Sequence, residues 1–220
     1  MKKSISLIII GAGGHAAELD DYIYVANQSV SGEVNYSILG YLDDDAESYS
    51  RYAFSAPYLG SIQEHQVQSD TAYLMGIANL KHRKNITLDF LARGGHFLSF
   101  IHPSANISRT TVIGEGVVIA PHVNLGPNTC IGDHTIINSR CSIGHDTVVG
   151  AFNFLTPNVC LSGFTVVGDE NLFGINSATI PNIQVGSRNK IMAGMTLDKN
   201  VGDDEVVFYR FKEKVIATVK

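Results

Sequence analysis

A repeat of six residues restricts the fold of this chain more than any other feature of its sequence. From Ile101 to Leu197 every sixth residue is apolar in sixteen of seventeen cases, with Thr179 as the exception, and no residue is inserted or deleted. Chance would supply about eight, because hydrophobic residues make up 45% of the chain. The period matches neither a helix, with about 3.6 residues per turn, nor an alternating strand, with about two. It predicts a coil with three flat sides, in which each six residues form a short strand and a corner, and one aliphatic side chain points inward.

Glycine marks many of the predicted corners. The chain has 21 glycines and only 6 prolines, and a glycine often follows the repeated aliphatic residue. A glycine there is expected to let the chain bend without a side-chain clash, and Asn and Asp, which tolerate turn conformations, fill many other corners. These glycines are therefore predicted to be architectural. They are Gly114, Gly126, Gly132, Gly144, Gly150 and Gly186.

The first hundred residues have a different pattern, which predicts the start of a βαβ unit. An apolar strand is expected over residues 4–10, followed by the turn Gly-Ala-Gly-Gly-His at 11–15 and by a helix over 16–26. Such a turn points free backbone N–H groups at an anion from the helix N-terminus. The spacing also fits the dinucleotide fingerprint formally, although that signal alone is weak.

Further strands and a second helix complete this half. Strands are expected over 36–42 and 72–77, a short element at 58–61, and a helix rich in Lys and Arg over 80–93. The second strand ends in three aspartates at 43–45. An acidic residue after this strand can accept hydrogen bonds from a ribose or a base N–H, and a solvated turn is the alternative.

Composition excludes several classes of protein. The balance of 16 Lys and Arg against 21 Asp and Glu gives a net charge of -5, which argues against nucleic-acid binding. No stretch approaches the roughly 18 to 20 apolar residues of a membrane span. The apolar run after Met1-Lys2-Lys3 is too short for a signal peptide, and three cysteines is an odd count, so we expect a reduced, soluble, cytoplasmic protein.

One of the 8 histidines stands out by its context. His145 follows a corner glycine and precedes Asp146, whereas no histidine lies in a spacing typical of a structural metal site. A histidine can act as a general base that takes the proton of an attacking amine or hydroxyl. A neighbouring acid can raise its basicity and fix its tautomer. The alternative interpretation of His145 is an exposed corner side chain.

The repeat resembles that of the hexapeptide-repeat acyltransferases over residues 99–201. The resemblance implies a left-handed parallel β-helix of five to six coils, about 27 Å tall at about 4.8 Å per coil. It also implies a homotrimer with the helices side by side. The expected fold class is thus α/β followed by β, with a Rossmann-like domain at 1–98, the β-helix acyltransferase domain at 99–201, and a capping tail at 202–220.

A second resemblance covers nearly the whole chain. The Gly-x-Gly-Gly-His turn, then Leu-Asp-Asp, then the hexapeptide helix are similar to the NeuD/PglD-type nucleotide-sugar acetyltransferases. This resemblance implies that the N-terminal half holds a nucleotide-sugar and that acetyl-CoA is the co-substrate, without a metal. It implies N-acetylation of a nucleotide-linked 4-amino-deoxy sugar, for a surface polysaccharide or glycan.

The resemblance also implies roles for individual residues. His145 would be the general base, Asp146 its modulating partner where the family often has Glu, and Asn138 a positioning group. The residues expected against the nucleotide-sugar are Gly13, Gly14 and His15 at the diphosphate-sugar, Asp43 and Asp44 at the nucleoside, and Gly60 where the ligand approaches closely. The residues expected along coenzyme A are Phe154, Gly163, Ile175, Ala193 and Gly194.

Other functions remain open at this point. The nearest is an O-acetyltransferase that acts on a sugar hydroxyl, such as that of a sialic acid. A non-catalytic protein that keeps the trimeric β-helix for binding alone is another. A covalent route through Cys141 is ranked below direct transfer, and a nicotinamide-dependent oxidoreductase is disfavoured because the repeat fills the rest of the chain.

Overall fold

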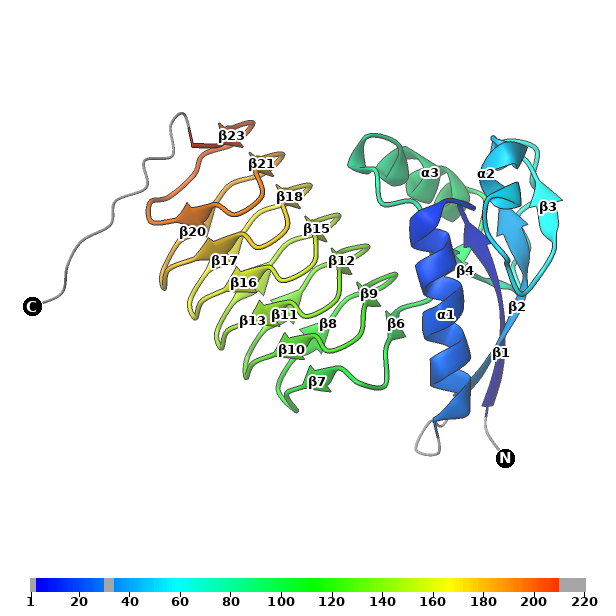
Figure 1. Cartoon of the computed structure of the whole chain (residues 1–220), viewed down its shortest axis with the longest axis horizontal. Coiled ribbons are helices and arrows are strands. Elements are labelled where there is room, and N and C mark those ends of the chain that lie inside the picture. Colours follow the sequence, from blue (N-terminus) through cyan, green and yellow to red (C-terminus); the bar gives the residue numbers. More distant parts are fainter. Residues whose placement is uncertain (1–2, 30–33, 210–220) are drawn as a thin grey trace, which may run out of the picture.

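The fold has two parts in the computed structural model, which describes residues 3–29 and 34–209 (Figure 1). A parallel α/β domain comes first, and a three-sided coil of very short strands follows it. The expected fold class is confirmed by this arrangement.

The N-terminal domain is a five-stranded parallel sheet in the order β3-β2-β1-β4-β5. The chain order reverses beside β1, and such a switch point opens a crevice at the carboxyl ends of the strands. The strands are β1 (Lys3–Ile10), β2 (Val34–Leu42), β3 (Tyr58–Gly60), β4 (Ala72–Met75) and β5 (His96–Phe97), and the helices are α1 (Gly14–Gln28), α2 (Ala46–Ser50) and α3 (Leu80–Ala92).

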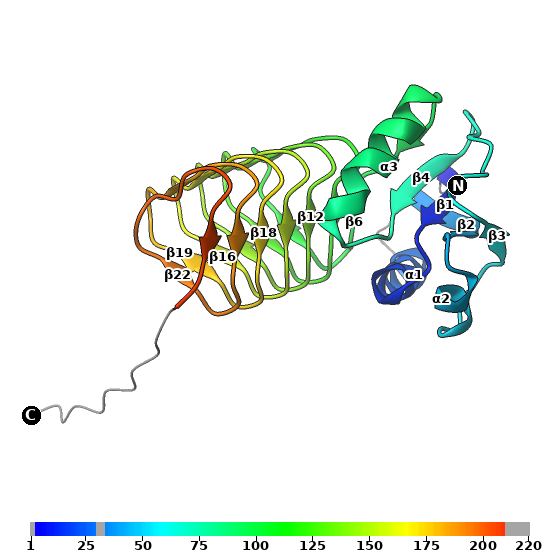
Figure 2. The same cartoon turned by 90° about the horizontal axis from the view of Figure 1, so that it is seen from above.

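The two long helices cover opposite faces of this sheet, as Figure 2 shows. Alternate residues of β1 point to opposite faces, so Leu7 and Ile9 share a buried cluster with α1 while Ile8 and Ile10 share another with Phe90 of α3. Both helices lie where the sequence predicted them, and the short α2 was not predicted.

The second part repeats a two-residue strand every six residues. Each strand from β6 to β22 ends on a residue of the six-residue repeat, so the predicted register is confirmed. Side 1 consists of β6 (Phe100–Ile101), β9 (Val118–Ile119), β12 (Ile136–Ile137), β15 (Phe154–Leu155), β18 (Leu172–Phe173), β21 (Lys190–Ile191) and β23 (Val206–Val207). Side 2 consists of β7 (Asn106–Ile107), β10 (Asn124–Leu125), β13 (Ser142–Ile143), β16 (Cys160–Leu161), β19 (Ala178–Thr179) and β22 (Thr196–Leu197). Side 3 consists of β8 (Val112–Ile113), β11 (Cys130–Ile131), β14 (Val148–Val149), β17 (Val166–Val167) and β20 (Gln184–Val185).

The corners show why glycine recurs, and the expected reason was wrong. Left-handed backbone falls on every sixth residue from His122 to Arg188, none of which is glycine, and φ there lies between 55° and 65°. The glycines instead face the backbone of the next coil. A Cβ on Gly126 would lie 2.8 Å from the backbone nitrogen of His145, and one on Gly144 would lie 2.6 Å from that of Gly163. These glycines are therefore required by the close stacking of coils rather than by the bend.

The N-terminal domain packs on side 1 of the β-helix. The outward residues Phe100, Val118 and Ile136 of this side are buried in the same cluster as α1, and Phe154 packs against that cluster. On the other face of the domain, α3 reaches the corner between sides 3 and 1. There the buried Arg83 donates from Nη2 to the backbone oxygens of Phe152, at 2.6 Å, and of Asn153, at 3.1 Å.

The last described residues continue the coil beyond the six-residue repeat. Val201 pairs with Val185, and β23 pairs with β21 after a step of 16 residues, which is 206 minus 190, in place of 18. Val207 packs on the end of the core. The predicted capping tail at 202–220 is described only to residue 209, and the rest lies outside the described residues. Within the described part of the chain, no helix is long and apolar enough to cross a membrane.

Candidate active site

His145 lies on the corner between β13 and β14, where sides 2 and 3 meet. Its Nδ1 is 2.7 Å from Oδ2 of Asp146. Asp146 occupies the left-handed corner position, with φ of 56°, and its Oδ1 accepts a hydrogen bond from Nδ2 of Asn128 at 3.0 Å. The bonds from Asn128 and then from His145 hold the pKa of the Asp146 carboxyl below its usual value.

The hydrogen bond to Asp146 assigns the tautomer of His145. An ionised carboxylate can only accept, so Nδ1 must carry the proton and Nε2 presents its lone pair. The side chain of His145 is 56% exposed, so this nitrogen is accessible. The arrangement therefore leaves Nε2 as a nitrogen that can accept a proton, directed away from Asp146.

The next coil shapes the floor under His145. The ring of Phe164 meets that of His145 edge-on, with 5.1 Å between centroids. A Cβ on Gly163 would lie 2.8 Å from Cε1 and 2.9 Å from Nε2 of His145. The expected coenzyme A residue Gly163 thus also makes room for the imidazole.

Asn138 lies at the other edge of side 2, on the corner between sides 1 and 2. It is 6% exposed, and its Oδ1 accepts the backbone N–H of Ser139 at 2.6 Å. Within a single chain, Asn138 and His145 therefore lie on two different corners.

The other residues expected along coenzyme A lie at two further places. Ile175, Ala193 and Gly194 lie on the corner between sides 1 and 2, where Ile175 is 45% exposed and accepts the N–H of Gly194 at 2.8 Å. Phe154 lies on side 1, with its ring centroid 6.3 Å from that of His15. Within a single chain, neither the corner with Ile175, Ala193 and Gly194 nor Phe154 lies at His145.

The glycine turn lies at the switch point beside β1. Gly13 is the N-cap of α1 without a side-chain capping bond, and a Cβ there would meet nothing within 4 Å. The first N–H groups of a helix have no partner within the helix, so the turn is open to an anion. The side chain of His15 is 8% exposed, and its buried Nε2 has no hydrogen-bond partner among the described residues. Gly14 faces the hydroxyl of Tyr52.

The two aspartates after β2 have different surroundings. Asp43 uses both oxygens inside the protein, since Oδ2 accepts the N–H of Ala12 at 2.7 Å and Oδ1 that of Asp45 at 2.9 Å. Asp44 uses Oδ1 for the hydroxyl of Ser61 and the N–H of Ile62, at 2.7 and 2.9 Å. Asp43 therefore ties the glycine turn to β2, and Asp44 keeps Oδ2 available.

Gly60 lies at the end of β3, next to these aspartates. Its φ is 108°, a conformation that favours glycine, and a Cβ there would meet nothing within 4 Å. Its carbonyl accepts the N–H of Asp43 at 3.1 Å. The position is open, as close approach of a ligand would require.

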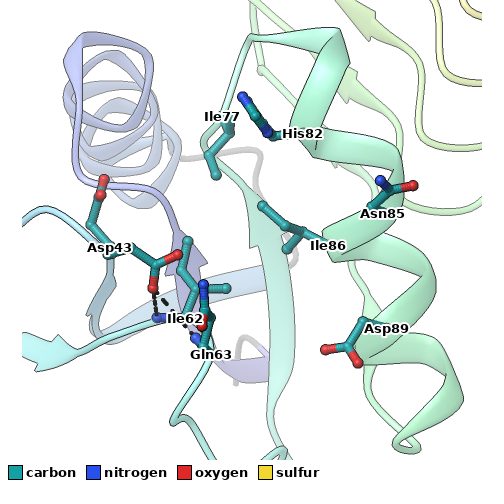
Figure 3. Close-up of a pocket in the computed structure, with 9 residues that line it drawn as sticks. Asp43, Ile62, Gln63, Ile77, His82, Asn85, Ile86 and Asp89 are labelled. Atoms are coloured by element: carbon teal, nitrogen blue, oxygen red, sulfur yellow. Dashed lines mark hydrogen bonds between the residues drawn. The ribbon is translucent and has the colours of Figure 1, made fainter.

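A cavity of about 530 Å³ opens beside Asp43 and Asp44 (Figure 3). Its other wall is one face of α3, which the sequence analysis did not select. Helical spacing of 82, 85, 86 and 89 predicts one such face, but no sequence signal says what that face meets. The cavity residues that the sequence missed include Ile62, Gln63, Ile77, Asn85, Ile86 and Asp89.

The basic residues of α3 do not line this cavity. Lys84 pairs with Glu170 of the β-helix, with 2.6 Å between Nζ and Oε1, and Arg83 is buried against the β-helix as described. These two residues therefore fix α3 on the β-helix. Among the described residues, no group of three or more His, Cys, Asp or Glu side chains is placed to hold a metal ion.

Comparison with known proteins agrees with this architecture. Residues 6–90 match the family described as the PglD N-terminal domain. The chain is similar to UDP-N-acetylbacillosamine N-acetyltransferase of Bacillus subtilis (strain 168), with 26% identity over 116 residues, which are 52% of this chain and 50% of that protein. The match thus spans half the length of this curated relative.

Two solved structures have the same fold over almost the whole chain. One is the acetyltransferase domain of PglB from Neisseria gonorrhoeae FA1090 in complex with acetyl coenzyme A, with a TM-score of 0.82, 24% identity, and coverage of 92% of this chain and 95% of that one. The other is PerB from Caulobacter crescentus in complex with CoA and GDP-perosamine, with a TM-score of 0.75, 24% identity, and coverage of 91% and 92%.

The fold and the His145–Asp146 corner define a class of protein, a hexapeptide-repeat β-helix that carries a parallel α/β domain on one side. Within this class, residues 6–90 match the PglD N-terminal domain family, and the chain is similar to a curated N-acetyltransferase and to the acetyltransferase domain of PglB. The resemblance predicted from the sequence is thereby confirmed.

Proposed function

We propose that this protein transfers the acetyl group of acetyl-CoA to the amino group of a nucleotide-linked 4-amino-deoxy sugar. The observation that carries the proposal is the accessible Nε2 of His145, whose tautomer is fixed by the 2.7 Å contact of Nδ1 with Asp146. The relatives support the substrate class, since they include an N-acetyltransferase of a nucleotide sugar and a protein solved with CoA and GDP-perosamine.

In the proposed reaction the sugar amine attacks the thioester carbonyl directly. The new C–N bond forms as Nε2 of His145 takes a proton from the amine, and the C–S bond then breaks. The proton on His145 passes to the departing sulfur, which leaves as the thiol of CoA. Asp146 stabilises the imidazolium between the two steps, as an acid beside a catalytic histidine does.

A covalent route through Cys141 is disfavoured by its surroundings. The residue is 1% exposed, and its thiol faces the backbone oxygen of Thr156 at 3.2 Å. Burial raises the pKa of the Cys141 thiol to about 12. Because the thiolate is the nucleophile, this cysteine is unsuited to carry the acetyl group.

We also propose that the protein acts as a homotrimer whose sites form between chains. The N-terminal domain packs on side 1, but His145 lies on the one corner that side 1 does not form. The outward residues of side 3 include Val112, Val148 and Val166, which are 62%, 42% and 45% exposed. A second copy against this side would bury the apolar row and bring its own N-terminal domain toward His145.

Mixing two variants tests this arrangement. His145→Ala removes the base, and Gly13→Glu puts a carboxylate where the diphosphate is expected. If each site takes its nucleotide domain and its histidine from different chains, an equal mixture of the two variants regains about one quarter of the wild-type sites. If the mixture is as inactive as each variant alone, the proposal that sites are shared between chains is contradicted.

A substrate panel tests the reaction itself. Acetyl-CoA is supplied with nucleotide-linked amino sugars and, separately, with free sialic acid, and CoA release is recorded. The proposal expects release only with the amino sugars. Release with sialic acid alone would favour the O-acetyltransferase, and no release together with no binding of CoA would favour a non-catalytic binding protein.

A further inference from the structure

The cavity between Asp44 and α3 has a chemistry that distinguishes nucleobases. We propose that it binds the guanine of a guanosine-diphosphate sugar, with Asp89 accepting the two neighbouring N–H groups of the base. This inference rests on the proposed function, because it names the nucleotide of that same substrate.

The charge of the cavity selects a nucleoside rather than a phosphate. Three carboxylates line it, those of Asp43, Asp44 and Asp89, and no lysine or arginine of the described residues is in its lining. A diphosphate would be repelled there, whereas the N-terminus of α1 at Gly13 favours an anion. The phosphates therefore belong at the glycine turn and the uncharged end of the nucleotide in the cavity.

The walls of the cavity suit a flat ring. Ile62 approaches from the loop after β3 and Ile86 from α3, and Ile77 lies at one end of the gap between them (Figure 3). A base between Ile62 and Ile86 buries both of its faces against apolar side chains. The cavity volume of about 530 Å³ also leaves room for the ribose. The hydrogen bonds of Asp44 to described residues use only its Oδ1, so Oδ2 is the acceptor placed for a ribose hydroxyl.

Asp89 determines which hydrogen-bonding groups the edge of the base must present. Its Oδ2 is 2.6 Å from Nη2 of Arg93, and Arg93 is itself held by the backbone oxygen of His65 at 2.8 Å. This ion pair engages Oδ2, and the Asp89 carboxylate lies across the gap from Gln63 (Figure 3). A carboxylate only accepts, so the base must present donors to it.

Only guanine presents two neighbouring donors to such a group. Its N1–H and exocyclic N2–H₂ lie side by side on one edge. Uracil and thymine have a single N–H between two carbonyl oxygens, and adenine and cytosine place a ring acceptor next to the amine. The carboxylate would meet an acceptor with each of these four bases. The amides of Gln63 and Asn85, which also line the cavity, can donate to O6 of guanine.

Binding of GDP, UDP, dTDP, ADP and inosine diphosphate to the wild-type protein, measured by calorimetry, tests this proposal. We expect GDP to bind about 10- to 100-fold more tightly than UDP or dTDP, as for a bidentate pair with a base. Inosine diphosphate, which lacks N2–H₂, should bind between them. A preference for UDP or dTDP overturns the guanine site and leaves the proposed function standing. If none of the five binds, the proposed function falls as well.

A substitution then tests the role of Asp89. Asp89→Asn should lose most of the preference for GDP and change UDP binding by less than about threefold. Asp21→Asn is the matched control, because it removes one exposed helical carboxylate outside the cavity and should leave the preference intact. An Asp89→Asn protein that keeps its full GDP preference contradicts the assignment, and the wild-type ligand series stands even if this variant does not fold.

Discussion

Gly163→Ala should abolish most of the proposed acetyl transfer without unfolding the protein. The added Cβ would lie 2.8 Å from Cε1 and 2.9 Å from Nε2 of His145. Non-bonded carbons rest at about 3.5 to 4.0 Å, so the ring must move by about 0.7 to 1.2 Å. The moving atoms include the proton acceptor itself, and a displacement of about 1 Å in a reacting group costs about 100-fold in rate.

The structure predicts a small effect of this change on stability. The side chain of His145 is 56% exposed, so the ring can turn into solvent and the coil need not shift. We therefore expect kcat to fall about 100-fold, while the Tm changes by only a few degrees. Both are measurable on one preparation, from CoA release with the amino-sugar nucleotide that the substrate panel identifies and from thermal unfolding.

Gly202→Ala is the matched control for this substitution. Gly202 is also a corner glycine, but its Cβ would meet only the flexible side chain of Glu205, at 3.0 Å, on the corner between sides 3 and 1. The kcat of the Gly202→Ala protein should stay near that of the wild type. Wild-type kcat in the Gly163→Ala protein would refute the reasoning, because the ring of His145 would then not be needed in its observed place.

Three further predictions follow from single contacts. In native protein at pH 8, iodoacetamide should label the exposed Cys160 and spare the buried Cys141, whose pKa is raised to about 12 by burial; peptide mass spectrometry that finds both labelled contradicts this. Arg83→Met should lower the free energy of unfolding by about 2 to 4 kcal/mol, because the backbone oxygens of Phe152 and Asn153 lose their donor. Lys84→Ala, which breaks a part-exposed ion pair, should cost about 1 kcal/mol or less. Equal losses of the two variants in urea unfolding refute the distinction. Asp146→Asn should lower kcat about 10- to 100-fold with little change in KM for acetyl-CoA, since the tautomer is no longer fixed; an unchanged kcat removes this residue from the mechanism.

The β-helix could be predicted in detail because each inward position has the same requirement. One aliphatic side chain must fill each side of each coil, so the position of Ile143 or Leu161 in a strand follows from counting by six. The reason for the corner glycines did not follow, because it depends on the backbone of the next coil, eighteen residues away. Counting does not reveal that a Cβ on Gly126 would strike His145.

The candidate site was predicted only in part, for a related reason. Asn138 and His145 are seven residues apart, which is about one side of the coil, so their positions on neighbouring corners were already contained in the sequence. The surroundings of Arg83 could not be predicted from the sequence, because a basic helix face in solvent and one buried against Phe152 have the same sequence pattern. The cavity wall at Asp89 depends in the same way on contacts between distant segments.

His145→Ala tests the central claim most directly. Turnover of acetyl-CoA with the amino-sugar nucleotide should fall by about 100- to 10,000-fold, the contribution of a positioned general base. The dissociation constants of CoA and of the nucleotide-sugar, measured on the same protein, should stay within about threefold of the wild type, because the imidazole acts on a proton rather than holding a ligand. Turnover close to that of the wild type would contradict the account.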